Sequence, residues 1–121
     1  MKRKIMIVDD DTDILLTLRM IFEQEDFEVF AVDSGEDCIK ELEKGFEGIV
    51  LMDIIMPFMS GVETIKKIIE KGLEKNIILS VITGRQKNYL DEINEIKPYI
   101  TDYISKPFDI QKLTSDINNL T

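Results

Sequence analysis

The chain has 121 residues, of which 44% are hydrophobic and 32% charged, and its formal net charge is −9. This size and balance predict one globular domain over 1–121, large enough to fold without disulfides or metals. The negative charge argues against direct nucleic-acid binding, because phosphate contacts need clustered lysine and arginine. One cysteine, Cys38, and no histidine exclude an internal disulfide and a structural zinc site.

The sequence also lacks the signals of export and of membrane insertion. The apolar run at 5–8 is only four residues long and stops at three aspartates, which is too short for a signal peptide. No run approaches the roughly 18 apolar residues of a membrane span. We therefore expect a cytoplasmic protein with no membrane contact.

Short apolar runs alternate with helical spacing through the first half of the chain. A strand is predicted at 5–8, followed by a helix with Thr12 as a plausible N-cap. A second strand is predicted at 27–32, and Ser34 opens a helix that ends at Gly45. The helical apolar positions are Ile14, Leu15, Leu18, Ile21, Phe22, Ile39 and Leu42.

The same alternation continues to the end of the chain. Strands are predicted at 49–52, 77–82 and 100–104, and a helix follows each of them. Pro98 limits the helix before the last strand. The helical apolar positions expected to face inward are Ile65, Ile68, Ile69, Leu90, Ile93, Ile96, Ile110, Leu113, Ile117 and Leu120. The pattern predicts an α/β fold of the (βα)5 type, a doubly wound parallel sheet with helices on both faces.

Polar residues gather where these strands end, which is where open α/β sheets bind ligands. They are Asp9, Asp10 and Asp11 after the first strand, Asp53 after the third, Thr83 after the fourth and Lys106 after the fifth. Carboxylates crowded in a partly desolvated site repel one another and need a cation. Oxygen ligands without His or Cys point to Mg²⁺, whose open positions suit phosphate oxygens.

These residues predict a phosphoryl-transfer site in which one carboxylate is the nucleophile. Lys106 can offset negative charge, and the Thr83 hydroxyl can donate to a phosphoryl oxygen. Each residue alone has a simpler explanation, since Asp11 could be a helix N-cap, Thr83 a turn residue and Lys106 a solvated lysine. Their joint placement favours the site, although a site that only binds Mg²⁺ would use the same residues.

Four segments carry a resemblance to a known family, and together they span the chain. They are IMIVDDD at 5–11, IVLMDIIMPFMSG at 49–61, VITG at 81–84 and DYISKPF at 102–108. The chain resembles the receiver domain of bacterial and archaeal two-component response regulators. The resemblance implies a flavodoxin-like sheet with strand order 2-1-3-4-5.

The resemblance also implies roles for single residues. Asp53 would accept the phosphoryl group, and Asp9, Asp10, Asp53 and the backbone carbonyl of Ile55 would hold Mg²⁺. Thr83 and Lys106 would contact the phosphoryl oxygens, and Tyr103 would be the aromatic switch residue. The Lys106–Pro107 bond is expected to be cis.

The implied function is signalling rather than enzymatic turnover, although such a domain assists its own phosphorylation and dephosphorylation. A histidine kinase or phosphotransfer protein would donate the phosphoryl group. Phosphorylation would then remodel the surface of the fourth helix, fifth strand and fifth helix, and so control a target protein or an output domain. The chain would be a monomer or a phosphorylation-promoted dimer, and either free-standing or part of a longer protein.

Three departures from the family pattern concern switching. Gly84 stands where the family mostly has alanine, and 95–101 lacks the usual small residues before the last strand. Ile55 and Arg85 occupy positions that tune phosphate lifetime in the family. A bulky Ile55 could shield the acyl phosphate from water, so we predict a phosphorylated state that lasts minutes or longer.

Three other functions share parts of this pattern. An aspartyl-phosphate phosphatase needs a second carboxylate two residues after the nucleophile, where Ile55 stands. A pseudo-receiver, which never takes phosphate, would not need the complete set of site residues. A flavodoxin-type protein shares the architecture, but acidic strand ends would repel the phosphate of FMN.

Overall fold

The computed structural model describes residues 2–84 and 90–120, with the backbone alone at 90 and 91. The strands are β1 (Arg3–Val8), β2 (Phe27–Val32), β3 (Gly48–Asp53), β4 (Ile77–Thr83) and β5 (Asp102–Ser105). The helices are α1 (Thr12–Gln24), α2 (Gly35–Glu43), α3 (Gly61–Glu70), α4 (Leu90–Ile96) and α5 (Ile110–Asn118). Two short 3-10 helices, η1 (Leu73–Asn76) and η3 (Lys97–Tyr99), precede β4 and β5.

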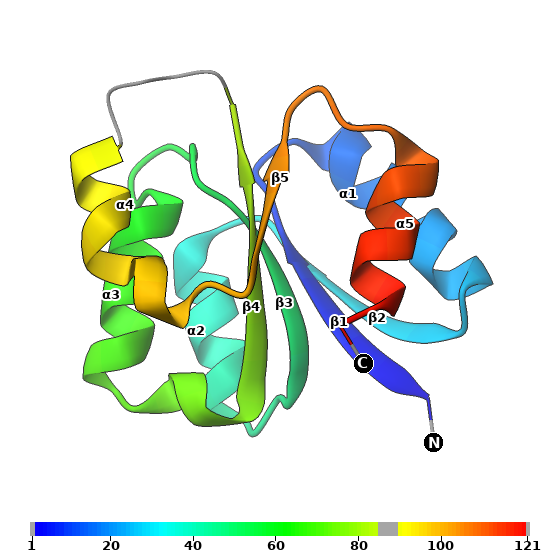
Figure 1. Cartoon of the computed structure of the whole chain (residues 1–121). Helices are drawn as coiled ribbons and strands as arrows, with labels where there is room; N and C mark the ends of the chain where they lie inside the picture. Colours follow the sequence, from blue (N-terminus) through cyan, green and yellow to red (C-terminus); the bar gives the residue numbers. More distant parts are fainter. Residues whose placement is uncertain (1, 85–89, 121) are drawn as a thin grey trace.

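The strands form one parallel sheet in the order β2-β1-β3-β4-β5, which confirms the predicted α/β fold and strand order. Helices α1 and α5 cover one face of the sheet, and α2, α3 and α4 cover the other (Figure 1). Strands β1 and β3 lie in the middle and are buried from Ile5 to Val8 and from Ile49 to Asp53. Burial on both faces explains why these segments are continuously apolar.

Each face of the sheet has its own hydrophobic core. Side chains under α1 and α5 include Leu18, Phe22, Leu113 and Ile117, which pack on Ile5, Ile7, Ile49 and Leu51. The opposite core includes Cys38, Leu42, Ile65, Ile68 and Ile96, which pack on Met6, Val8, Val50 and Met52. Neighbouring residues of one strand thus serve opposite cores, as the two-residue period of a strand requires. Cys38 is fully buried in this second core.

The helix starts confirm one predicted cap and correct another. Ser34 caps α2 as predicted, because its hydroxyl oxygen accepts from Asp37 N at 3.1 Å. The prediction that Thr12 caps α1 was wrong. Asp11 is the cap, and its Oδ1 accepts from Asp13 N at 2.9 Å and from Ile14 N at 3.4 Å. The carboxylate of Asp11 therefore satisfies helix donors.

The C-terminal part of the chain differs most from expectation. Strand β5 begins at Asp102 rather than at Ile100, because Lys97–Tyr99 form the short helix η3, which Ile100 caps. The expected inward face of α5 was wrong at Ile110, which is 47% exposed. Phe108, just before that helix, packs on the core. Among the described residues, no helix is long and apolar enough to cross a membrane.

Candidate functional site

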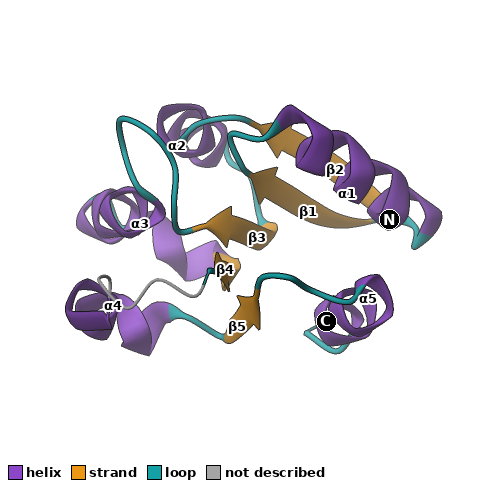
Figure 2. Cartoon of the chain, turned by 90° about the horizontal axis from the view of Figure 1, so that it is seen from above, coloured by secondary structure: helices purple, strands orange, loops and turns teal. Residues whose placement is uncertain are grey.

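Asp9 and Asp53 lie side by side at the carboxyl end of the sheet. Asp9 directly follows β1, and Asp53 is the last residue of the neighbouring strand β3. Figure 2, viewed from above, shows β1 and β3 adjacent in the middle of the sheet. Both aspartates are buried, with 1% and 5% exposure respectively. Two carboxylates at the centre of the sheet therefore have little water to solvate them.

Asp10 completes a cluster of three carboxylates. One oxygen each from Asp9, Asp10 and Asp53 lie within 4.8 Å of one another, and Asp10 is the exposed member. Asp9 Oδ2 is buried and has no hydrogen-bond partner, although buried polar atoms normally have one. Crowded carboxylate oxygens of this kind are the donor set that hard divalent cations prefer. The cluster thus fits a divalent metal ion.

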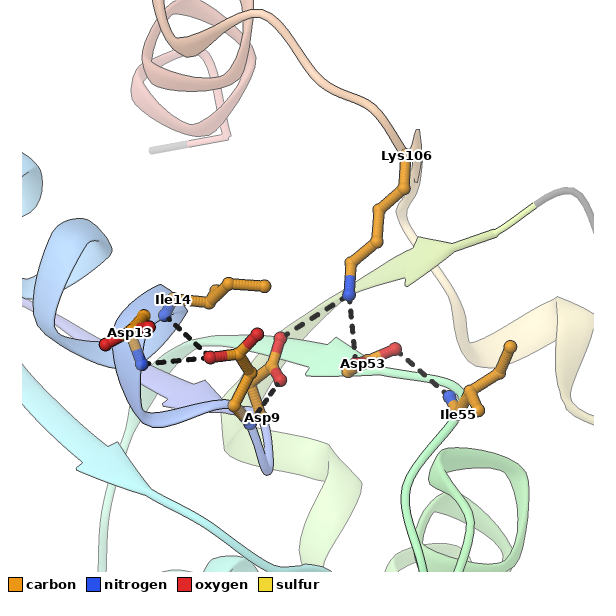
Figure 3. A network of polar contacts seen from close by, with 7 residues as sticks. Asp9, Asp13, Ile14, Asp53, Ile55 and Lys106 are labelled. Carbon is orange, nitrogen blue, oxygen red and sulfur yellow. Dashed lines mark hydrogen bonds and ion pairs between the residues drawn. The ribbon is translucent and has the colours of Figure 1, made fainter.

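Lys106 reaches into this cluster from the loop after β5. Its Nζ lies 3.1 Å from Asp53 Oδ2 and 3.7 Å from Asp9 Oδ2 (Figure 3). Its backbone N donates to Thr83 O at 2.8 Å, which ties the loop to the end of β4. The Lys106–Pro107 peptide bond is cis, as predicted.

The charges of the site shift the pKa values of Asp9 and Lys106. Burial, more than any other cause, raises the pKa of Asp9 from 3.8 to about 6, and repulsion from Asp53 and Asp10 adds to it. The hydrogen bond from Asp11 N and the charge of Lys106 act in the opposite direction. Burial lowers the pKa of Lys106, but the hydrogen bond and attraction to Asp53, Asp9 and Asp10 outweigh it, so that pKa is raised. Without a bound metal ion, Asp9 therefore holds its proton to a higher pH than an ordinary aspartate does.

The other side of Asp53 is held by backbone. Asp53 Oδ1 accepts from Ile55 N at 3.1 Å, so the two carboxylate oxygens have different partners. Gly61, at the start of α3, donates its backbone N–H to Ile54 O at 2.8 Å. A Cβ at Gly61 would lie 2.4 Å from the carbonyl oxygen of Asp53, so only glycine allows this contact. In the sequence, Gly61 stands out only as the last residue of the segment at 49–61, and its close approach to Asp53 is seen in the structure alone.

Thr83 and Tyr103 share one face of the sheet. Val81 pairs with Tyr103 and lies two residues before Thr83, so the three side chains point the same way. Thr83 is also next to Ile82, the strand partner of Asp53. Tyr103 is 42% exposed and lies on the edge strand β5. The structure thus places Thr83 beside the end of β3, and Thr83 and Tyr103 on the same face of the sheet.

Gly84 leaves space next to the site. Among the residues that the structure describes, a Cβ at Gly84 would have one neighbour within 4 Å, Ile55 Cδ1 at 3.9 Å. Gly84 also lines an open hollow with Lys106, Ile14, Pro107 and Phe108. Arg85, the other position expected to affect phosphate lifetime, lies outside the described residues. At the end of β2, Asp33 is exposed and takes no part in the carboxylate cluster.

Comparison with known proteins gives one consistent family. The family model described as response regulator receiver domain matches residues 5–118. The aerobic respiration control protein ArcA of Escherichia coli is 34% identical over 116 residues, which cover 96% of this chain and 47% of ArcA. The chain spans about half the length of the curated relatives it matches.

Solved structures give the same fold. A CheY-like response regulator receiver domain protein from Methanospirillum hungatei is 35% identical, with a TM-score of 0.87, over 99% of this chain and 94% of that protein. TrrA from Thermotoga maritima, solved in complex with Mg²⁺–BeF, has a TM-score of 0.81 over 98% of this chain and 99% of its own. TrrA is 24% identical, so it supports the fold alone.

Proposed function

Since the chain belongs to the response regulator receiver domain family, we propose that Asp53 is its phosphoacceptor in a Mg²⁺-dependent reaction. The observation that carries this proposal is the environment of the Asp53 carboxylate. It is buried, lies in a cluster with Asp9 and Asp10, and has the Lys106 ammonium 3.1 Å from one oxygen. A buried carboxylate beside a cation and two further acids is suited to nucleophilic attack on phosphorus.

The proposed reaction transfers one phosphoryl group. A carboxylate oxygen of Asp53 attacks the phosphorus of the donor, the bond from phosphorus to the donor breaks, and the donor leaves with that electron pair. Lys106 offsets charge on the phosphoryl oxygens, and the Thr83 hydroxyl donates a hydrogen bond to one of them. Bound Mg²⁺ would supply further positive charge, held by Asp9, Asp10, Asp53 and the Ile55 carbonyl.

The proposed response follows from the position of Thr83. When the Thr83 hydroxyl moves toward the phosphoryl group, it leaves space on the sheet face that it shares with Tyr103. The Tyr103 ring then turns inward and changes the surface formed by α4, β5 and α5. Receiver domains interact with histidine kinases or phosphotransfer proteins and with output domains. For this chain we propose such a kinase or phosphotransfer protein as donor, and a target protein or an output domain as recipient.

Several predictions from the sequence stand beside this proposal. They are one receiver domain over 1–121, no direct nucleic-acid binding, a cytoplasmic location, and a monomer or phosphorylation-promoted dimer. The absence of a carboxylate at Ile55, two residues after Asp53, favours a signalling role over a phosphatase.

Incubation with acetyl phosphate and Mg²⁺, followed on a phosphate-affinity gel, tests the proposal. We expect a shifted band that EDTA prevents and that Asp53→Asn abolishes. Asp33→Asn is the matched control, because Asp33 also follows a strand but is exposed and outside the cluster. An unchanged shift in Asp53→Asn, or repeated turnover of a phosphomonoester by the wild type, would contradict the proposal.

A further inference from the structure

An ion pair connects α4 to α3 on the side of the molecule where the switch is proposed. Lys66 Nζ on α3 lies 2.8 Å from Glu95 Oε2 on α4. This is the shortest ion pair among the described residues, where the others measure 3.1–3.7 Å. Figure 1 shows α4 beside α3, at the outer side of the sheet.

Lys66 is the cation of a small acidic group that spans both helices. The hydrogen bond to Glu95 raises the pKa of Lys66 against the effect of burial, and attraction to Glu95, Glu92 and Glu63 adds to it. Glu63 lies three residues before Lys66 on α3, and Glu92 lies three residues before Glu95 on α4. Without Lys66, these three carboxylates would lose the positive charge that attracts each of them.

Helix α4 is short, and most of its described side chains are exposed. The helix has seven residues and packs against α3 and η3. Among its described side chains, Ile96 is the one that is fully buried, and Ile93 is partly buried. The ion pair adds a specific contact between α4 and α3 to this packing.

The position of α4 is linked to the phosphorylation site through both of its ends. The chain reaches α4 from β4, whose last residue is Thr83. It leaves α4 through η3 and enters β5, which carries Tyr103 and is followed by Lys106. A shift of α4 is therefore coupled along the chain to Thr83 and Tyr103, the residues proposed to respond when Asp53 is phosphorylated.

We propose that the Lys66–Glu95 ion pair is a latch that holds α4 against α3 while Asp53 is unphosphorylated and so opposes switching. This inference rests on the proposed phosphoacceptor function. In the proposed switched state this pair is broken, so part of the phosphoryl group's differential affinity for that state is spent on separating Lys66 from Glu95. The pair is exposed, with 40% and 67% of its two side chains accessible, so salt weakens the latch.

Beryllofluoride with Mg²⁺, a stand-in for the phosphoryl group on aspartate, provides the test. Its apparent dissociation constant is measured by amide NMR signals for the wild type, Lys66→Ala, Glu95→Gln and the double variant. We expect Lys66→Ala to bind about two- to fivefold more tightly than the wild type, as an exposed ion pair allows. Glu95→Gln should also bind beryllofluoride more tightly than the wild type, and the double variant should bind little more tightly than either single variant. In about 0.5 M NaCl the difference in affinity between the wild type and these variants should become smaller.

Lys71→Ala is the matched control. Lys71 is the C-cap of α3 and pairs with Glu43 of α2 at 3.4 Å, with similar exposure, so this ion pair links α3 to α2 instead of to α4. The affinity of the Lys71→Ala variant for beryllofluoride should equal that of the wild type. An unchanged or weaker affinity in Lys66→Ala, or an equal gain in Lys71→Ala, overturns the latch while leaving the phosphoacceptor function intact. A wild type that does not bind beryllofluoride, or an Asp53→Asn variant that binds it equally well, overturns both.

Discussion

The acceptor site and the switch side of this domain are built differently. The acceptor site stands at the ends of the central strands β1 and β3, where Asp9 and Asp53 are buried between two hydrophobic cores. The switch side includes the four-residue edge strand β5, the half-exposed Tyr103 and α4, which packs on α3 and η3. Close packing thus fixes the atoms of the proposed acceptor site, whereas the proposed conformational response involves elements that are more exposed.

The free energy of unfolding should depend on pH through Asp9, and this is the largest effect expected at the acceptor site. The folded pKa of Asp9, about 6, lies above its unfolded value of 3.8. The native state therefore binds the proton more tightly, and stability is lost as pH rises through this window. Without Mg²⁺, the Asp9→Asn variant should not show this loss. Its free energy of unfolding at pH 7 should exceed that of the wild type by up to about 3 kcal/mol.

Urea unfolding at several pH values in EDTA measures this difference. Asp33→Asn, at an exposed aspartate after β2, should keep the wild-type slope. Added Mg²⁺ should narrow the gap between wild type and Asp9→Asn, since the ion stabilises the native state that binds it. Parallel pH profiles for wild type and Asp9→Asn would show that burial of the carboxylate at Asp9 carries no cost.

Alanine substitutions at Gly61, beside Asp53, and at Gly84, after β4, should affect the free energy of unfolding differently. A Cβ at Gly61 would lie 2.4 Å from Asp53 O and 2.7 Å from Ile54 Cα, so backbone must move. We expect Gly61→Ala to lower the free energy of unfolding by about 1–3 kcal/mol. At Gly84 the nearest described neighbour of an added Cβ would be Ile55 Cδ1 at 3.9 Å, so Gly84→Ala should leave the free energy of unfolding equal or raise it by about 0.4–1 kcal/mol.

Urea midpoints of the two variants give this comparison directly. The same preparations should differ in Mg²⁺ affinity, with Gly61→Ala weaker because its Cβ displaces the backbone of Asp53. Equal stability losses at Gly61 and Gly84 would contradict the distinction between the two regions.

The smallest effect concerns the lifetime of the phosphorylated state. Ile55 is partly buried, and its N–H binds Asp53 Oδ1. If its side chain shields the acyl phosphate, the wild type decays with a half-time of minutes or longer. Ile55→Ala should then decay faster by up to about tenfold, equal to about 1.4 kcal/mol in the barrier.

Decay of the labelled protein after removal of acetyl phosphate measures this lifetime. Ile110→Ala is a matched control, since Ile110 is 47% exposed at the start of α5. A wild-type half-time of a few seconds would contradict the shielding role, as would equal decay of Ile55→Ala and the wild type.

The two regions also differ in how far the sequence predicts them. Asp9 and Asp53 follow apolar runs whose burial on both faces leaves one arrangement, so their meeting was predictable. Lys106 was predictable because parallel strands end at one edge of the sheet. The packing of Gly61 on Asp53 was not predictable, since it depends on how closely α3 approaches β3. The predictions of where β5 starts and of a buried Ile110 were wrong, because residues at the periphery have fewer neighbours to fix their positions.

The most direct test of the account is to identify which residue is phosphorylated. Borohydride reduces an aspartyl phosphate and marks the residue that carried it, which peptide mass spectrometry then locates. After incubation with acetyl phosphate and Mg²⁺, we predict that the mark lies on Asp53 alone and is absent when EDTA replaces Mg²⁺. A mark on Asp9 or Asp10, or none at all under conditions where the protein is folded, would contradict the assignment of Asp53 as the phosphoacceptor.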